Sequence, residues 1–410
     1  MKEDIRKNIK KREQLMEKDS RQIEILKYLL NRADEKFIDE IFTFVNKKSN
    51  IKIREENMKK IIGEDIEDKK REIIDLISKI EDNYEFEKIL SFINRKFIRD
   101  NIREFMLEKI GSVGYNIDNL ITNIIIESPS SYKSKIDLIT HLKEKKYVFR
   151  GSRILENKKG NFYELNEISN QCFESVKKQI VNLDGSLGFR QVQGAGELYF
   201  SLFGKDITFS SKSDLKILDK NVEVKSSRRS KSGDINGGRF SGTSFYGNMS
   251  SAAKVFFDSL KSAGVSEEKI EKYRKELNLN MKGLTNLNSL IKDHSVKYED
   301  VFNIFKNIFK IILMKMDEKR IEHYINRFLN FDGTVNISEF FKTCALISFE
   351  YYKQIEGFDI LLMINTDSGN YIIIENVEDL ENNIENMKIS NIPSWSEGRK
   401  PSISPQIIIY

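Results

Sequence analysis

Cysteine is nearly absent from this sequence. Cys172 and Cys344 are the only two among 410 residues, and two thiols cannot build a disulfide framework. Both lie among apolar residues, which predicts two buried thiols in a reducing compartment. Histidine is also scarce: His141, His294 and His323 are scattered and lack the spacing of metal ligands, which argues against a histidine-based metal centre.

Long apolar runs are missing as well. No stretch approaches the roughly 20 apolar residues that a membrane-spanning helix requires, so we expect no membrane contact. The first 18 residues, MKEDIRKNIKKREQLMEK, are charged throughout and lack the apolar segment of a signal peptide. The net charge is only +5, so a role with nucleic acid would have to depend on local basic patches.

The pattern of apolar residues divides the chain into four regions. Residues 1–146 show helical spacing, with one helix expected around Ile23–Val45, and predict an all-helical N-terminal region. Residues 147–246 are richer in glycine, and short runs such as YVFRGSRIL and DITFS look extended. Residues 247–335 return to a lysine-rich helical pattern and predict a helical insertion.

Residues 336–410 are predicted to complete the core that begins at residue 147. ISEFFKTCALISFEYYKQIE, residues 337–356, predicts a helix buried on most sides. FDILLMIN and NYIIIEN predict two strands around the turn TDSG.

The segment SDLKILDKNVEVKSS, residues 213–227, predicts a hairpin that carries three unexpected polar residues. Alternating apolar residues predict two strands around a turn at residues 219–221. Glu223 and Lys225 are two apart and therefore point to the same face of their strand. Asp214 precedes Glu223 by nine residues, so the hairpin can place the two acids side by side. We expect both at a solvent-reached end of the sheet, where substitution would leave the fold intact.

An acidic-x-basic triplet alone carries little information. With 63 acidic and 68 basic residues in the chain, roughly 10 such triplets are expected by chance. Context distinguishes Glu223-x-Lys225: GAGELYFSLFG lies just upstream and predicts a short helix over residues 195–204. Glu197 in its first turn could reach the same end of the sheet. The simpler alternative is a surface hairpin with an ordinary Glu–Lys pair.

Neighbouring carboxylates repel each other, and burial pushes one of them to take up a proton. A divalent cation removes this conflict, and Mg²⁺ needs only one or two protein carboxylates beside its waters and substrate oxygens. Asp214, Glu223 and Glu197 are therefore the candidate metal ligands, with Mn²⁺ as a substitute for Mg²⁺. We expect Lys225 to act as an electrostatic and positioning group rather than as a free-amine base.

Together, Glu197, Asp214 and Glu223-Val224-Lys225 resemble the active site of the PD-(D/E)XK nuclease superfamily. The resemblance implies an α/β, restriction-endonuclease-like core: a helix with the first glutamate, a three-stranded meander with the aspartate and the E-x-K, a second helix and a further strand. Ser213 replaces the proline of the family name. The run DLKILDKNVEVKSS…GGRFSG also resembles nucleases of large tailed phages, over about residues 190–245.

A basic, glycine-rich segment follows the hairpin. Arg228, Arg229, Lys231 and Arg239 are the candidate DNA-binding residues, because they could meet phosphates while Gly237-Gly238 lets the backbone approach closely. Residues 147–245 carry 16 basic against 11 acidic residues, a local excess equal to that of the whole chain. The alternative is a solvated loop.

The resemblance implies a Mg²⁺-dependent DNA nuclease of the endonuclease type, encoded by a phage or mobile element. Such a protein would act in the host cytoplasm or on the virion. A DNA-binding or virion-structural protein with a vestigial nuclease fold stays open, as does an RNA nuclease. A homodimer, or a phage-protein partner bound through the helical regions, also stays open.

Overall fold

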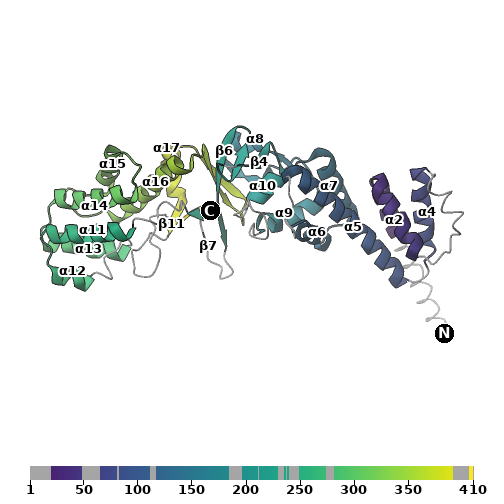
Figure 1. Cartoon of the computed structure of the whole chain (residues 1–410), viewed down its shortest axis with the longest axis horizontal. Coiled ribbons are helices and arrows are strands. Elements are labelled where there is room, and N and C mark those ends of the chain that lie inside the picture. The colour runs from purple at the N-terminus through teal and green to yellow at the C-terminus, as the bar shows by residue number, and fades with distance from the viewer. Residues whose placement is uncertain are drawn as a thin grey trace, which may run out of the picture. The chain divides into compact units, whose positions relative to one another are not determined.

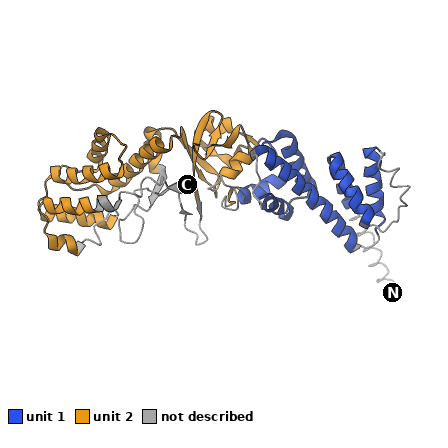
Figure 2. Ribbon diagram, viewed as in Figure 1, with its two compact units in different colours: residues 1–148, 167–180, 187–190 blue, residues 149–166, 181–186, 191–410 orange. Residues whose placement is uncertain are grey.

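The computed structural model describes most of the chain in two compact units. The described residues are 20–48, 65–80, 83–110, 117–183, 196–210, 212–229, 235–236, 238–239, 249–273, 281–390 and 406–409. Unit 1 consists of residues 1–148, 167–180 and 187–190, and unit 2 contains the rest (Figure 2). Over the described residues, no helix combines the length and the apolar content that crossing a bilayer requires.

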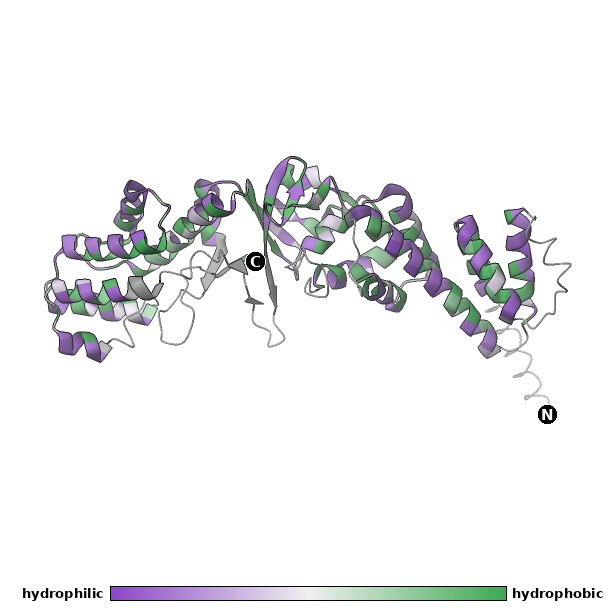
Figure 3. Ribbon diagram, in the orientation of Figure 1, coloured by the Kyte–Doolittle hydropathy of each residue, from purple (hydrophilic) through white to green (hydrophobic). Residues whose placement is uncertain are grey.

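The described residues of unit 1 are helical. Within them, a helix over residues 20–30 is followed by α2 (Glu35–Lys48), α4 (Ile66–Ser78), α5 (Asn83–Ile110), α6 (Ile117–Glu127), α7 (Tyr132–Lys145) and most of α9 (Gln171–Val181). Hydrophobic and hydrophilic residues alternate along these helices, as amphipathic packing requires (Figure 3). One expectation was wrong: the stretch Ile23–Val45 is not continuous, because the chain turns at residues 31–34 and the Asp34 carboxylate accepts a hydrogen bond from the Phe37 amide of α2 at 2.9 Å.

Unit 2 is built on a mixed sheet with the strand order β2-β10-β9-β6-β5-β4. The strands are β2 (Lys159–Asn161), β4 (Ile207–Phe209), β5 (Leu215–Ile217), β6 (Lys220–Arg229), β9 (Ile360–Asn365) and β10 (Asn370–Ile374). β4, β5 and β6 form an antiparallel meander, β9 runs parallel to β6, and β10 returns antiparallel. The short β7 (Ile235–Asn236) pairs with the end of β6. The molecule is thus a mixed α/β protein with many helices (Figure 1).

The β5–β6 hairpin differs from its prediction by about one residue at the turn. Ile217 pairs with Lys220, so the turn is Leu218-Asp219 and not residues 219–221. Leu218 has φ = +55°, a left-handed conformation that leucine rarely adopts. The run YVFRGSRIL also departs from expectation: only β1 (Phe149–Arg150) is extended, and α8 (Gly151–Asn157) begins directly after it.

Helices cover both faces of this sheet. α16 (Ile337–Glu356) lies on the face of Leu361 and Met363, because both share a buried apolar cluster with residues of α16. α10 (Glu197–Phe203) packs near β4 on the other face, which carries Ile364 (Figure 1). The middle strands are buried between the two layers: all six residues of β9 are buried.

A helical module is inserted in the chain between β6 and α16. It contains α11 (Met249–Ser262), α12 (Glu267–Tyr273), α13 (Met281–Asp293), α14 (Tyr298–Ile312) and α15 (Glu318–Phe328). Its buried residues form one apolar cluster with α16 and with β9. The module therefore shares a core with the helix that covers the sheet.

Short elements complete unit 2. β3 (Gly204–Lys205) pairs with β1, while β11 (Met387–Ser390), β12 (Gln406–Ile409) and β8 (Gly238–Arg239) form a small antiparallel sheet. The helix α17 (Val377–Asn383) and the 3₁₀ turn η4 (Ile384–Asn386) connect β10 to β11, and another 3₁₀ turn, η1 (Phe162–Glu164), follows β2.

Candidate active site

The hairpin brings Asp214 and Glu223 together. Leu215 pairs with Val222, so the next positions along the two strands, Asp214 and Glu223, face each other at the end of β5. The Val224 amide donates a hydrogen bond to Oδ2 of Asp214 at 2.8 Å, and the two carboxyl groups are themselves hydrogen-bonded. This is the juxtaposition that the nine-residue spacing predicts.

Burial sets the charge state of Asp214 in this pair. Loss of solvent, and then the negative charge of Glu223, raise the pKa of Asp214 from its ordinary value of 3.8 to about 6. Lys225 and the Val224 amide act in the opposite direction without cancelling that effect. Asp214 therefore takes up a proton readily, or, in its place, a cation shared with Glu223.

Lys225 and Tyr352 hold the other carboxylate. The Lys225 ammonium is ion-paired with Oε1 of Glu223, and the Tyr352 hydroxyl donates a hydrogen bond to the same oxygen at 2.5 Å. Burial, followed by the charge of Glu223, raises the pKa of Tyr352 above its ordinary value, so this hydroxyl remains a donor. The Lys225 Nζ also lies 5.3 Å from the centre of the Tyr352 ring.

Glu223 is more enclosed than its sequence suggests. The residue is only 6% exposed, whereas we expected both acids at a solvent-reached strand end. α16 causes the difference, because Tyr352 covers the face of β6 from which Glu223 projects. Sequence reasoning missed Tyr352: it lies 129 residues from Glu223, and the apolar pattern of α16 marks it only as a core residue.

Glu197 does not join the pair. It begins α10 and is 4% exposed. A Cβ on the preceding Gly196 would lie 2.4 Å from Cδ1 of Ile364, so the start of α10 touches the face of the sheet that carries Ile364. Ile364 pairs with Ser226, and successive residues of a strand alternate between faces. α10 therefore starts on the face opposite to Glu223 and Lys225.

The predicted set of three carboxylates is consequently not assembled. Over the described ranges, no three His, Cys, Asp or Glu side chains are grouped so as to hold a metal ion. The pair of Asp214 and Glu223 still suits Mg²⁺, which takes one or two protein carboxylates and completes its shell with water and phosphate oxygens. Each carboxylate of the pair has one oxygen bound by protein donors, which leaves the other for a shared proton or cation.

The predicted DNA-binding residues are described only in part. Arg228 and Arg229 lie at the end of β6, where they pair with Asn236 and Ile235, and Arg239 lies in β8. Lys231 falls outside the described residues. The backbone thus places the two arginines on the same strand as Glu223 and Lys225, three to six residues further on.

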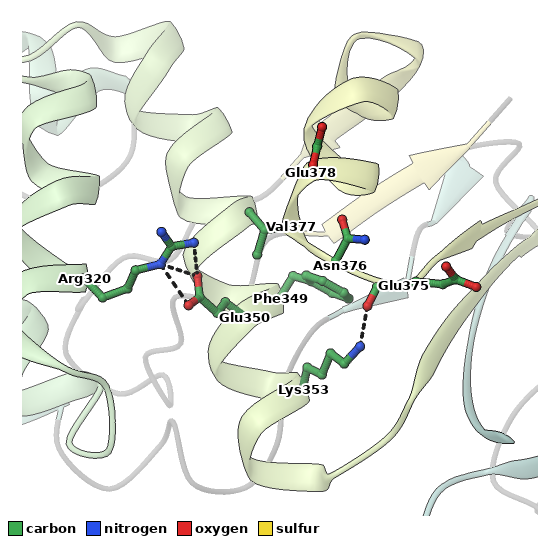
Figure 4. Close-up of a pocket in the computed structure, with 8 residues that line it drawn as sticks. All are labelled: Arg320, Phe349, Glu350, Lys353, Glu375, Asn376, Val377 and Glu378. Atoms are coloured by element: carbon green, nitrogen blue, oxygen red, sulfur yellow. Dashed lines mark hydrogen bonds and ion pairs between the residues drawn. The ribbon is translucent and has the colours of Figure 1, made fainter.

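A hollow elsewhere in unit 2 is lined by none of the predicted site residues. About 390 Å³ in volume, it opens between α15, α16 and the segment after β10 (Figure 4). The two cations that line it already bind protein groups. Arg320 binds both oxygens of Glu350 at 2.9 Å, and Lys353 donates to the backbone oxygens of Glu375 and Asp359. The hollow therefore carries structural ion pairs rather than a second candidate site.

Comparison with known proteins adds no relative. No family model, no curated protein and no solved structure matches the chain. Function is therefore inferred from the geometry around Asp214, Glu223 and Lys225.

Proposed function

We propose that this protein is a Mg²⁺-dependent DNA endonuclease with a restriction-endonuclease-like core of the PD-(D/E)XK type. The observation that carries the proposal is the carboxylate pair of Asp214 and Glu223 with Lys225 ion-paired beside it. Two acids and a lysine on one sheet face supply the groups that metal-assisted phosphodiester hydrolysis requires.

The order of elements supports the same proposal. α10 is followed by the meander β4-β5-β6, then by α16 and then by β9. This is the helix, three strands, helix and strand that the resemblance implies, with the helical module α11–α15 inserted between β6 and α16. β9 joins the sheet beside β6, so the strand with the E-x-K lies inside the sheet and not at its edge.

Each residue has a separate task in this proposal. Asp214 and Glu223 would hold the metal ion, which polarises the scissile phosphate and lowers the pKa of a bound water. Lys225 would stabilise the charge that develops on the phosphate and orient the attacking water; its side chain is 18% exposed, so substrate can approach it. Tyr352 would keep the Glu223 carboxylate in one orientation.

One observation favours an alternative without catalysis. Glu223 is buried and already bound by Lys225 and Tyr352, and no third acidic ligand stands beside it among the described residues. A DNA-binding protein with a vestigial nuclease fold would show this arrangement as well. Such a protein would bind DNA and leave it intact under all metal conditions.

Plasmid nicking decides between the two functions. We expect supercoiled DNA to be nicked with Mg²⁺ or Mn²⁺ and to stay intact with EDTA, and we expect Asp214→Asn and Glu223→Gln to abolish nicking. Asp219→Asn, an exposed acid in the turn of the same hairpin, is the matched control and should keep full activity. Full activity of Asp214→Asn would refute the nuclease proposal, and an RNA substrate in parallel tests the choice of nucleic acid.

Lys225→Ala separates binding from chemistry. The variant should lose nicking while binding Mn²⁺ about as well as the wild type, because the lysine acts on the phosphate and water and is not a metal ligand. Lys216→Ala, an exposed lysine on β5, is the control. Isothermal titration with Mn²⁺ measures the affinity, and a loss as severe as that of Asp214→Asn would show that the assigned role is wrong.

A further inference from the structure

One face of α5 in unit 1 is both basic and aromatic. An α-helix has 3.6 residues per turn, so residues spaced by three, four or seven positions lie on one side. Six exposed residues of α5 follow this spacing, and we call them the α5 strip: Tyr84, Lys88, Phe92, Arg95, Arg99 and Arg103. At 1.5 Å per residue, the strip is about 28 Å long.

Three acidic residues of α5 are paired with lysines outside the α5 strip. Asp100 is ion-paired with Lys96 at 2.6 Å and Glu104 with Lys143 at 3.5 Å, while Glu108 is paired with Lys146. Among the strip's cations, Arg99 contacts an acid, its neighbour Asp100 at 3.3 Å. Over the described part of the chain, no ion pair neutralises the strip's other cations, Lys88, Arg95 and Arg103.

The aromatic rings of the strip are exposed yet held in place. Phe92 is 43% exposed and stacks on Phe44 of α2, with ring centres 4.2 Å apart. Tyr84 is 76% exposed, and the Lys88 Nζ lies 5.8 Å from the centre of its ring. Exposed rings among cations offer flat apolar surfaces beside positive charge.

This combination indicates the class of partner. A duplex presents its phosphates and keeps its bases stacked inside, so it would use the cations and leave the rings without a function. An unpaired strand presents both groups: its phosphates pair with cations and its bases stack on aromatic side chains.

We propose that the α5 strip binds single-stranded DNA. Arg95, Arg99 and Arg103 would meet consecutive phosphates, because they are four residues or about 6 Å apart along the helix axis. Phe92 would stack on a base. The proposal goes beyond nuclease chemistry, since it gives unit 1 a substrate contact of its own that needs neither Asp214 nor a metal ion.

Fluorescence anisotropy with a labelled 20-nucleotide single strand tests the strip, in EDTA so that no cleavage occurs. The triple variant Arg95→Gln/Arg99→Gln/Arg103→Gln should lower the slope of log K against log salt by up to about 2, because each lost contact to a single strand removes about 0.7. The control Lys36→Gln/Lys133→Gln/Lys145→Gln removes the same charge from exposed positions on α2 and α7, and should keep the wild-type slope.

Phe92→Leu tests the stacking. The variant keeps an apolar side chain against Phe44. We expect its affinity for the single strand to fall about fivefold or more, with an unchanged salt slope. The duplex of the same sequence should bind more weakly than the single strand and should be insensitive to Phe92→Leu. Circular dichroism melts confirm that each variant is folded.

The two proposals fail separately. If the triple variant keeps the wild-type slope, or if the duplex binds as tightly as the single strand and Phe92→Leu has no effect, the strip does not bind single-stranded DNA. Nicking that requires Asp214 would still stand in that case. If the slope falls as expected but the wild type never nicks DNA, only the nuclease proposal is lost.

Discussion

At the scale of single residues, the charge of Asp214 depends on its buried surroundings. Its pKa of about 6 lies above the ordinary value of 3.8, because burial and Glu223 disfavour its ionised form. The folded chain therefore binds a proton at Asp214 more readily than the unfolded chain does. This contribution to stability is present in acid and is lost as the pH rises toward and through 6.

Asp214→Asn should consequently change the pH dependence of stability. In EDTA, we expect the variant to melt at a higher temperature than the wild type at pH 8, because its free energy of unfolding is larger there by at most about 3 kcal/mol. Near pH 4 the two should melt at similar temperatures. Thermal melts at both pH values measure the effect, with Asp219→Asn as the control. An equal difference between variant and wild type at both pH values would contradict this account of Asp214.

The same residue should make metal binding pH-dependent. A metal ion must displace the proton from the acid pair, so Mn²⁺ should raise the melting temperature more at pH 8 than at pH 5. Asp214→Asn should abolish this stabilisation, whereas Glu197→Gln should retain most of it, because α10 starts on the opposite face of the sheet. If Glu197→Gln abolishes it as well, Glu197 moves into the site when metal binds.

At the scale of elements, α16 is the helix that completes the site. Glu223→Ala would leave the Tyr352 hydroxyl and the Lys225 ammonium without their acceptor, and a buried unsatisfied donor costs about 1–3 kcal/mol. The sequence-based expectation that this position tolerates alanine without loss of stability therefore requires revision.

Tyr352→Phe removes one hydroxyl and keeps the ring beneath Lys225. Because the hydroxyl orients Glu223 and does not touch substrate, we expect kcat to fall about tenfold and KM for DNA to stay within about twofold. Tyr351→Phe, the neighbouring position on α16, is the control. Steady-state nicking gives both constants, and a change confined to KM would assign Tyr352 to DNA binding instead.

The β5–β6 turn offers a prediction about stability. Leu218 holds a left-handed conformation at 48% exposure, and such a conformation costs an L-residue about 1–2 kcal/mol. Glycine adopts it without strain, so Leu218→Gly should stabilise the fold by about 1 kcal/mol. Urea unfolding measures the change, with Leu218→Ala, which keeps the strain, as the comparison; a loss of stability in the glycine variant would contradict the explanation.

The elements that sequence reasoning located best are those with a local signal. The apolar pattern of residues 337–356 corresponds to α16, and FDILLMIN corresponds to β9. YVFRGSRIL was assigned wrongly because the cause lies elsewhere in the fold. A Cβ at Gly151 would lie 2.8–2.9 Å from Ile207, Ile217 and the Lys205 oxygen, so α8 starts where only glycine fits against β4 and β5. The local secondary-structure propensity of the sequence cannot predict that contact.

At the scale of the whole molecule, the candidate site is assembled from distant parts of the chain. Asp214 and Glu223 come together through a two-residue turn, and their spacing alone predicts the contact. Tyr352 lies on α16, which follows the helical module in the chain, and no periodicity of the sequence relates it to Glu223. The hydrogen bond between them depends on how α16 packs on the sheet, so the sequence alone does not predict it.

The parallel pairing of β6 with β9 also sets the order of events during translation. Val222 and its partner Ile360 are 138 residues apart, so at 5–20 residues per second about 7–28 s separate their synthesis on the ribosome. Throughout that interval β6 has an open edge, and Tyr352 has not been made for most of it. A nascent chain in this state would contain the whole E-x-K hairpin but, on the proposed function, could not yet cut nucleic acid, because the strand and the helix that enclose the site are still to come.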